Sequence, residues 1–263
     1  MLILIVMNID KMFQWNPKRA TFYPKGKIIV IGHRGAPYLA QENTMESFKL
    51  AFEAGLKGVE LDVQLTRDDK LIIFHDWEII DKNGKSNKIS SLFYSEILLI
   101  SKENNFYVPQ LYEIFDILPK KHFINIEIKS LKIFDTGIEA QILELLQSYN
   151  ILDKIVISSF NPFSLHRVKR MNPQILIALL WTNNNSPLLI NTPLWAWICK
   201  PDGFHIDIDC LDVKIIHWVK SKKMTILSYT INNKGDFLLA KKMNLDGVFT
   251  DNPYLLLNNK TNK

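Results

Sequence analysis

The sequence predicts an α/β fold, a (β/α)8 TIM-like barrel with an extra hairpin strand after the second strand. Three observations lead to this prediction. Nine short aliphatic runs recur along the chain, amphipathic segments of helical length separate most of them, and the spacing of one pair rules out a helical connection. Alternation of this kind is typical of parallel strands covered by helices.

The aliphatic runs are the candidate strands. In chain order they are KIIVIGH, GVELDVQ, LIIFHD, HFINIEIK, KIVISSF, ILIALLW, DGFHIDI, MTILSYT and LDGVFTD. The amphipathic segments between them predict helices over Thr44–Ala54, Pro109–Leu118, Thr136–Tyr149, Pro162–Met171, Asp212–Lys222 and Lys234–Met243.

The third run is the extra strand. Only LTRDDK separates GVELDVQ from LIIFHD, whereas a parallel crossover needs about a dozen residues or more. The third run must therefore double back as a hairpin, and the eight remaining strands complete a barrel. The hairpin returns His75 to the carboxyl ends of the strands, where barrels of this type carry their chemistry.

Composition and charge limit the class of protein. With 47% hydrophobic and 22% charged residues, the chain is typical of a globular protein. The net charge is +5 and the pI about 9.0, but the basic residues are scattered, so we expect no nucleic-acid partner. Cys199 and Cys210 match no metal motif and are interpreted as reduced structural thiols.

The chain shows no linker or composition shift, so we predict a single barrel domain over residues 28–263. Residues 1–27 form an N-terminal extension that is expected to pack on the body of the domain. Its apolar start, MLILIVM, is too short to span a bilayer and lacks the basic residues of a secretion signal. We therefore expect a cytoplasmic protein without stable membrane insertion. The sequence makes no prediction of its oligomeric state.

Three carboxylates are predicted to meet in the barrel mouth. Strand side chains alternate in direction, so Glu60 and Asp62 share one face of their strand. The same alternation in INIEIK sends Asn125, Glu127 and Lys129 inward. Three half-buried acids repel one another unless a cation neutralises them. Oxygen ligands favour one hard divalent ion, Mg²⁺ or Ca²⁺.

Two histidines stand apart from the other histidines. His33 and His75 each end an aliphatic run, and each is followed by a charged residue, Arg34 and Asp76. Two imidazoles with ordinary pKa values near 6.5 can supply one base and one acid at neutral pH. We interpret His122, His166 and His217 as core or surface residues, and leave His205 open because it lies near the end of a strand.

Seven separated segments resemble, in order, the signatures of the glycerophosphodiester phosphodiesterase family. They run from about residue 28 to 256 and read HRGAP, QENTMESFKLAFEAG, GVELDVQLTRDDKLIIFHD, INIEIK, VISSFNP, LSYTINN and LDGVFTDNP. The chain departs from the family pattern at Gln41, where proline is usual, and in lacking the DRTT stretch common after the second histidine.

The resemblance implies a TIM-barrel phosphodiesterase and a role for each matching residue. It implies that His33 and His75 are the catalytic acid–base pair. It implies that Glu60, Asp62 and Glu127 bind the metal. Arg34 and Lys129 are then expected to hold the phosphate of the substrate.

The implied reaction is metal-dependent hydrolysis of a small glycerophosphodiester to glycerol 3-phosphate and an alcohol such as choline or ethanolamine. Phe160 and Tyr229, at the ends of two strands, are candidates for an apolar wall against the glycerol, with barrel core an equal alternative. A lysophospholipid phosphodiesterase, of phospholipase D type, stays open because Pro187–Lys200 is rich in Leu and Trp. So does a lyase that stops at a cyclic phosphate. A non-catalytic binding barrel is not expected, since the set of histidines, acids and bases is intact.

Overall fold

The computed structural model describes residues 15–24, 26–182 and 195–254. Its barrel strands are β1 (Ile29–Gly32), β2 (Gly58–Leu65), β6 (Phe123–Ile128), β7 (Ile155–Ser159), β8 (Leu176–Trp181), β9 (Gly203–Asp207), β10 (Thr225–Tyr229) and β11 (Gly247–Thr250). They are parallel and follow the order β1-β11-β10-β9-β8-β7-β6-β2, and β1 also pairs with β2, which closes the barrel. The predicted fold class is confirmed.

The predicted hairpin is also confirmed. Strand β3 (Leu71–Ile73) runs antiparallel to β2, with Val63 opposite Ile73 and Leu65 opposite Leu71. Beyond β3, the main chain of Phe74 donates a hydrogen bond to the carbonyl of Asp62. The hairpin therefore holds the residues after β3, including His75, beside the carboxyl end of β2.

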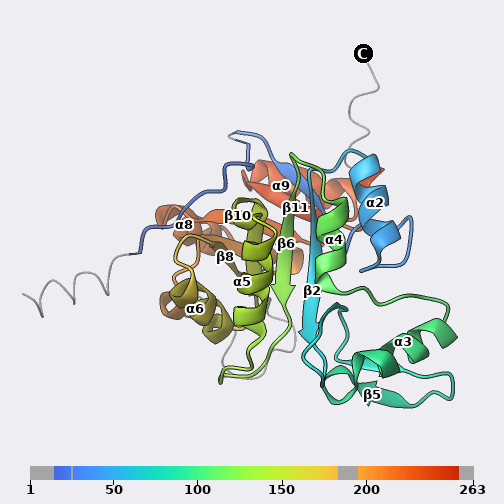
Figure 1. Ribbon diagram of the computed structural model, residues 1–263. Helices are drawn as coiled ribbons and strands as arrows, with labels where there is room; N and C mark the ends of the chain where they lie inside the picture. The colour runs from blue at the N-terminus through green and yellow to red at the C-terminus, as the bar shows by residue number, and fades with distance from the viewer. Residues whose placement is uncertain (1–14, 25, 183–194, 255–263) are drawn as a thin grey trace, which may run out of the picture.

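Helices cover the outside of the barrel, as Figure 1 shows. Those at predicted positions are α2 (Met45–Glu53), α4 (Leu111–Ile117), α5 (Ile138–Ser148), α6 (Pro162–Met171), α8 (Val213–Ser221) and α9 (Lys234–Lys242). The structure adds α7 (Ala196–Cys199) and the 3-10 turns Leu152–Lys154 and Ile208–Cys210. In the described parts of the chain, no helix has both the length and the apolar character needed to cross a membrane.

Polar side chains fix where several helices begin. The side chain of Thr44 accepts a hydrogen bond from the main-chain N–H of Ser47 at the start of α2. Asn161 and Asn233 cap α6 and α9 in the same way. These residue types satisfy main-chain donors that have no partner within the helix. The boundaries follow from local sequence for this reason.

An insertion between β3 and α4, residues 74–110, contains elements that the sequence analysis does not predict. It contains β4 (Glu78–Ile80), β5 (Ser86–Lys88), the 3-10 turn Ile89–Ser91 and α3 (Tyr94–Glu103). Ile79, Ile89, Ile97 and Val108 form its small core together with Ile72 of β3. Figure 1 shows the insertion beside the end of the barrel toward which the β2 and β6 arrows point. It therefore borders the barrel mouth.

Strand alternation divides the apolar residues between two layers. Val59, Leu61 and Val63 are fully buried in the layer between barrel and helices. Ile31, Phe123 and other residues form a separate cluster inside the barrel. The opposite faces of β2 and β6 are thus free to carry polar side chains inward.

His205, which the sequence left open, lies inside the barrel and away from its mouth. Its ring packs against Phe249, with 5.0 Å between ring centroids, and neither ring nitrogen has a hydrogen-bond partner among the described residues. Burial lowers its pKa to about 3, so the imidazole is neutral. The structure gives it a packing role.

Residues 15–24 lie across the amino-terminal end of the barrel. Phe22 stacks on Phe123 with 4.2 Å between ring centroids, and Tyr23 meets the same ring edge-on at 5.7 Å. Ala20 and Tyr23 are each only 5% exposed. This part of the extension covers the end of the barrel opposite the mouth.

We predict that Phe123→Ala lowers the free energy of unfolding by about 3–5 kcal/mol, because it removes a buried ring and leaves a cavity. Phe123 is 1% exposed and joins the barrel interior to Phe22 and Tyr23. Urea unfolding followed by circular dichroism measures the change. Phe134→Ala is the matched control, since Phe134 is 83% exposed, and should change stability by less than about 0.5 kcal/mol. Equal losses of stability in the two variants would contradict the burial of Phe123 between the barrel interior and residues 22–23.

Candidate active site

A cavity of about 400 Å³ opens at the carboxyl ends of the barrel strands. It contains most of the site residues expected from the sequence: His33, Arg34, Glu60, His75, Glu127, Lys129, Phe160 and Tyr229. Asp62 does not line it but belongs to the same cluster, where it is 1% exposed. The structure therefore brings together residues that lie up to 196 positions apart, from His33 to Tyr229.

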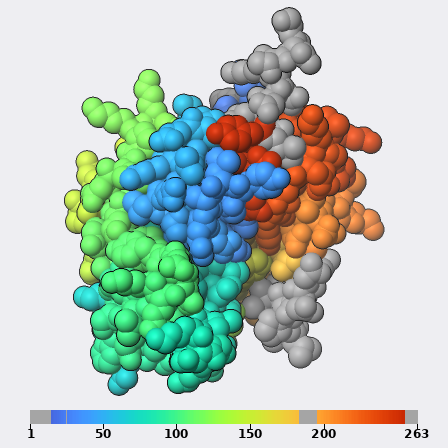
Figure 2. Space-filling model, turned by 90° about the vertical axis from the view of Figure 1, so that its right-hand side faces the viewer, coloured from blue at the N-terminus to red at the C-terminus, as the bar shows by residue number. Residues whose placement is uncertain are grey.

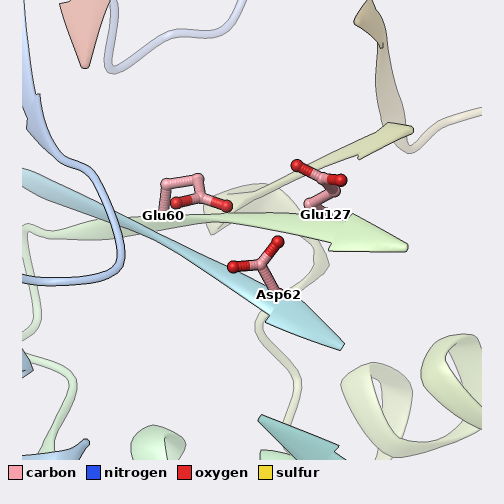
Figure 3. Close-up of side chains that lie close together, drawn as sticks. All are labelled: Glu60, Asp62 and Glu127. Atoms are coloured by element: carbon pink, nitrogen blue, oxygen red, sulfur yellow. The ribbon is translucent and has the colours of Figure 1, made fainter. Parts of the chain in front are cut away.

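Three carboxylates converge at this cavity, and two of them, Glu60 and Glu127, line it. Glu60 and Asp62 project from β2 and Glu127 from the neighbouring strand β6, where it stands in register with Asp62. Figure 3 shows the three carboxylates facing one another across the two strands. One oxygen of each lies within 4.8 Å of the other two. A single cation can be reached by all three.

Burial and mutual repulsion disfavour the charged forms of two of these acids. Burial, reinforced by Asp62 and Glu127, raises the pKa of Glu60 well above its usual range. Burial likewise raises the pKa of Glu127 to about 7, against the opposing effect of Lys129. Burial acts on Asp62 too, but Lys129, His75 and Arg34 hold its pKa below the ordinary value. An all-oxygen set with this repulsion fits a hard divalent cation.

Arg34 and Lys129 both contact the acid cluster. Arg34 donates its main-chain N–H to Glu60 Oε2 at 2.9 Å, and its Nε lies 3.3 Å from Asp62 Oδ2. Its Nη1 binds both oxygens of Glu42, at 2.9 and 3.0 Å. Lys129 Nζ lies 3.2 Å from Glu127 Oε1. Two fixed positive charges thus stand beside the acids.

The main-chain conformation at Arg34 and Gly35 allows the adjacent residues His33 and Arg34 both to reach the active site. Arg34 has a φ of +50° and Gly35 a φ of +92°. A side chain at Gly35 would collide with Ser47 of α2, since a Cβ would lie 2.4 Å from its Oγ. Glycine is required there because only it allows this approach. The HRG segment therefore turns sharply off β1 and directs Arg34 back over β2.

In each predicted catalytic histidine, Nδ1 lies within hydrogen-bond distance of a carboxylate. His33 Nδ1 lies 2.7 Å from Asp251 Oδ1, and His75 Nδ1 lies 2.7 Å from Asp76 Oδ1. A hydrogen bond donated by Nδ1 leaves Nε2 as the nitrogen that can take up a proton. Burial, aided by Lys129 and Arg34 and opposed by Asp62, lowers the pKa of His75. The contacts with Asp251 and Asp76 fix the orientation of both imidazole rings.

Sequence reasoning missed several residues of this site. Asp251 follows β11 in the segment TDNP and was not assigned a role. Glu42 fixes Arg34, and Asn43 donates a hydrogen bond from Nδ2 to Asp62 Oδ2 at 2.9 Å. Asp207 and Asp209 also line the cavity. The positions of these aspartates, at the end of β9 or just after β9 and β11, could have identified them as site residues. In TIM barrels the catalytic residues lie at the carboxyl ends of the strands.

Phe160 and Tyr229 form one wall of the cavity. Their rings meet edge-on with 6.3 Å between centroids, and both are partly exposed to the cavity. The Tyr229 hydroxyl donates a hydrogen bond to the main-chain oxygen of Trp181 at 3.0 Å. The hydroxyl is thus occupied, and the ring presents an apolar surface.

The sequence model of the glycerophosphoryl diester phosphodiesterase family matches residues 33–255. The chain belongs to this family. Family membership makes the protein an enzyme of the phosphodiesterase type. The match spans every residue of the cavity described above.

Curated relatives match the chain over different lengths. A glycerophosphodiester phosphodiesterase of Caldanaerobacter subterraneus is 34% identical over 243 residues, which is 88% of this chain and 97% of that protein. Human lysophospholipase D GDPD1 is 31% identical over 135 residues, which is 46% of this chain and 41% of that protein.

Among solved structures, a phosphodiesterase of Oleispira antarctica in complex with the product sn-glycerol-3-phosphate is 27% identical, with a TM-score of 0.74 over 90% of this chain and 97% of that one. A glycerophosphodiester phosphodiesterase of Thermotoga maritima is 26% identical, with a TM-score of 0.73 over 89% of this chain and 99% of that one.

Proposed function

We propose that this protein hydrolyses small glycerophosphodiesters to glycerol 3-phosphate and an alcohol, using His33 and His75 as acid and base. One observation carries the proposal. Two imidazoles oriented by carboxylates and two cationic side chains line one cavity at the carboxyl ends of the strands, together with Glu60 and Glu127 of a cluster of three carboxylates. The Oleispira enzyme, which holds sn-glycerol-3-phosphate, supports the product assignment.

The proposed metal ligands are Glu60, Asp62 and Glu127, and the ion is Mg²⁺ or Ca²⁺. Their carboxylates are oxygen donors, which hard divalent ions prefer. When bound, such an ion would neutralise phosphate charge and stabilise the charge that develops during cleavage. Lys129 and Arg34 contact the same carboxylates. A substrate phosphate bound to the ion would therefore also lie close to these two cationic side chains.

Arg34 and Lys129 are proposed to hold the phosphate. A phosphodiester is an anion that repels nucleophiles, so cleavage requires its charge to be offset. The guanidinium of Arg34 is held by Glu42 and Asp62, which leaves it a fixed planar donor. The Lys129 ammonium is a compact charge on the adjacent strand, next to Glu127.

The histidines are proposed to move protons at their Nε2 atoms. One imidazole would take the proton of the attacking oxygen, and the other would donate a proton to the departing alcohol. We propose that the attacking oxygen is the substrate's own neighbouring hydroxyl and that water then opens the cyclic phosphate. Asp251 and Asp76 would keep each ring in the required tautomer. The apolar wall of Phe160 and Tyr229 would receive the glycerol carbons.

A single assay tests the proposed function. Glycerophosphocholine, glycerophosphoethanolamine and lysophosphatidylcholine are each incubated with Mg²⁺, Ca²⁺ or EDTA, and products are followed by ³¹P NMR. Glycerol 3-phosphate from the first two substrates is the expected result. Accumulation of cyclic phosphate would identify a lyase. Turnover of lysophosphatidylcholine alone would favour the lysophospholipid alternative, whose sequence signal in Pro187–Lys200 lies largely outside the described residues.

Arg34→Lys is expected to lower kcat about tenfold with a smaller change in KM. Lysine keeps the positive charge but lacks the planar guanidinium, which can donate two hydrogen bonds to the phosphate oxygens as negative charge develops on them in the transition state. Lys129→Arg, which also keeps its charge, is expected to lose less. Steady-state kinetics on glycerophosphocholine measures both. An Arg34→Lys enzyme with unchanged kcat and KM would show that charge alone matters at this position.

A further inference from the structure

Three polar residues form a row at the carboxyl ends of three adjacent strands. Strand β11 pairs with β1 on one side and with β10 on the other. His33 directly follows β1, Asp251 directly follows β11, and Asn232 comes three residues after the end of β10. In Figure 2 the blue surface of the early described segments adjoins the red surface of the last ones, as the pairing of β1 with β11 requires.

Side-chain hydrogen bonds run along this row. Asp251 Oδ1 lies 2.7 Å from His33 Nδ1, and its other oxygen, Oδ2, accepts a hydrogen bond from Asn232 Nδ2 at 2.5 Å. The main-chain N–H of Asp251 donates in turn to Asn232 Oδ1 at 2.9 Å. Asn232 and Asp251 thus make two reciprocal hydrogen bonds. The carboxylate cannot turn about its side-chain bonds without breaking one of its contacts.

The main chain anchors both ends of the row to the end of β11. The N–H of Ile231 donates to the carbonyl of Phe249 at 2.8 Å, and the N–H of His33 donates to the carbonyl of Thr250 at 2.9 Å. The hydroxyl of Thr250 also donates to Asn232 Oδ1 at 3.3 Å. The barrel itself therefore sets the distance between Asn232 and His33.

The carboxylate beside the other histidine has no such support. The side chain of Asp76 is 72% exposed, whereas that of Asp251 is 30% exposed. Within the described parts of the chain, His75 is the one hydrogen-bond partner of the Asp76 carboxylate. Burial acts to raise the pKa of Asp251, but the hydrogen bonds with His33 and Asn232 hold it below its usual value. Asp251 therefore stays an ionised acceptor.

We propose that Asn232 is a positioning residue for the reaction: it fixes the Asp251 carboxylate, which holds the His33 ring with Nε2 free for proton transfer. The inference rests on the proposed acid–base role of His33. A carboxylate that holds an imidazole through Nδ1 sets both its orientation and its tautomer, and a linked set of hydrogen bonds is more rigid than its separate members. Asn232 does not line the active-site cavity, so it acts through Asp251.

Asn232→Asp tests this role, because it keeps the size and the oxygen acceptor but replaces the Nδ2 donor by a negative charge beside Asp251. The kcat for glycerophosphocholine should fall about tenfold or more, as loss of a hydrogen bond to a charged group does, with KM within about twofold. Asn232→Ala, which adds no charge, should act in the same direction. Asn233→Ala is the matched control, since Asn233 caps α9, and it should change neither constant.

A double variant shows whether Asn232 acts through Asp251. Asp251→Ala removes the carboxylate, so adding Asn232→Asp to it should lower kcat no further. A second readout needs no turnover. Proton–nitrogen NMR spectra of protein labelled with ¹⁵N-histidine show which ring nitrogen carries the proton, and His33→Ala identifies the signals of His33. Asn232→Asp should lower the fraction of His33 protonated at Nδ1, and Asn233→Ala should leave it unchanged.

The two readouts separate this inference from the proposed function. An unchanged His33 tautomer in both Asn232 variants would overturn the inference, and so would a further loss of kcat when Asn232→Asp is added to Asp251→Ala. A changed tautomer in a protein whose unaltered form cleaves no glycerophosphodiester would support the contact chain from Asn232 to His33 and overturn the proposed function instead.

Discussion

Alanine at His33 or His75 is expected to lower kcat about a hundredfold or more, the usual cost of losing a general acid or base. Both imidazoles line the same cavity, and each is fixed through Nδ1 by a carboxylate at 2.7 Å. The measurement is single-turnover and steady-state hydrolysis of glycerophosphocholine. His217→Ala is the matched control, since His217 is exposed on α8, and it should stay within about twofold of the unaltered enzyme.

The double variant His33→Ala, His75→Ala tests whether the two act together. If both protons move in one step, the double variant should be little worse than the worse single variant. Full additivity would show that the two histidines serve separate steps. Activity near that of the unaltered enzyme in either single variant would remove that histidine from the proposed pair.

Glu127→Gln is expected to weaken divalent-ion binding about tenfold or more, and activity with it. The change keeps size but removes one negative charge from the carboxylate set, and loss even of groups that only support a metal ligand typically costs roughly 10–100-fold. Isothermal titration with Mg²⁺ and with Ca²⁺ gives the dissociation constants without reference to turnover. Complete removal of divalent ions by EDTA is expected to abolish hydrolysis.

Glu144→Gln is the control for this variant, because Glu144 is exposed on α5 and outside the active-site cavity. It should bind metal as the unaltered protein does. Full activity of the EDTA-treated enzyme would contradict the whole metal assignment. Unchanged metal affinity in Glu127→Gln with lost activity would instead place Glu127 in the reaction but outside the ligand set.

Short-range patterns in the sequence were sufficient to predict the fold. Eight barrel strands, the hairpin and six helices lie where the periodicity and spacing placed them. This succeeded because strand alternation, helix caps such as Thr44, and the length of a connection are local properties. The inward direction of Glu60, Asp62 and Glu127 followed from the same alternation.

The structure of the insertion could not be predicted in this way. Helix α3 begins at Tyr94 and carries the exposed residue Leu99 beside the buried residues Ile97 and Ser101. Its apolar pattern is weak, and it is packed by the small core around Ile79 and Ile89. Tertiary contacts outweigh local preference in such a segment. A cavity between the insertion and the barrel depends on that packing, so no local pattern predicts it.

Local alternation and spacing determined the barrel, the inward acids and the two histidines at strand ends, because each of these depends on neighbours a few residues away. Which carboxylate pairs with His33 was decided only by the closure of the barrel. Asp251 reaches His33 across 218 positions because β1 and β11 pair along their whole length. The ring contact between His205 and Phe249 likewise joins two strands that are distant in sequence. Contacts between distant strands depend on how the whole sheet closes, and no local pattern encodes them.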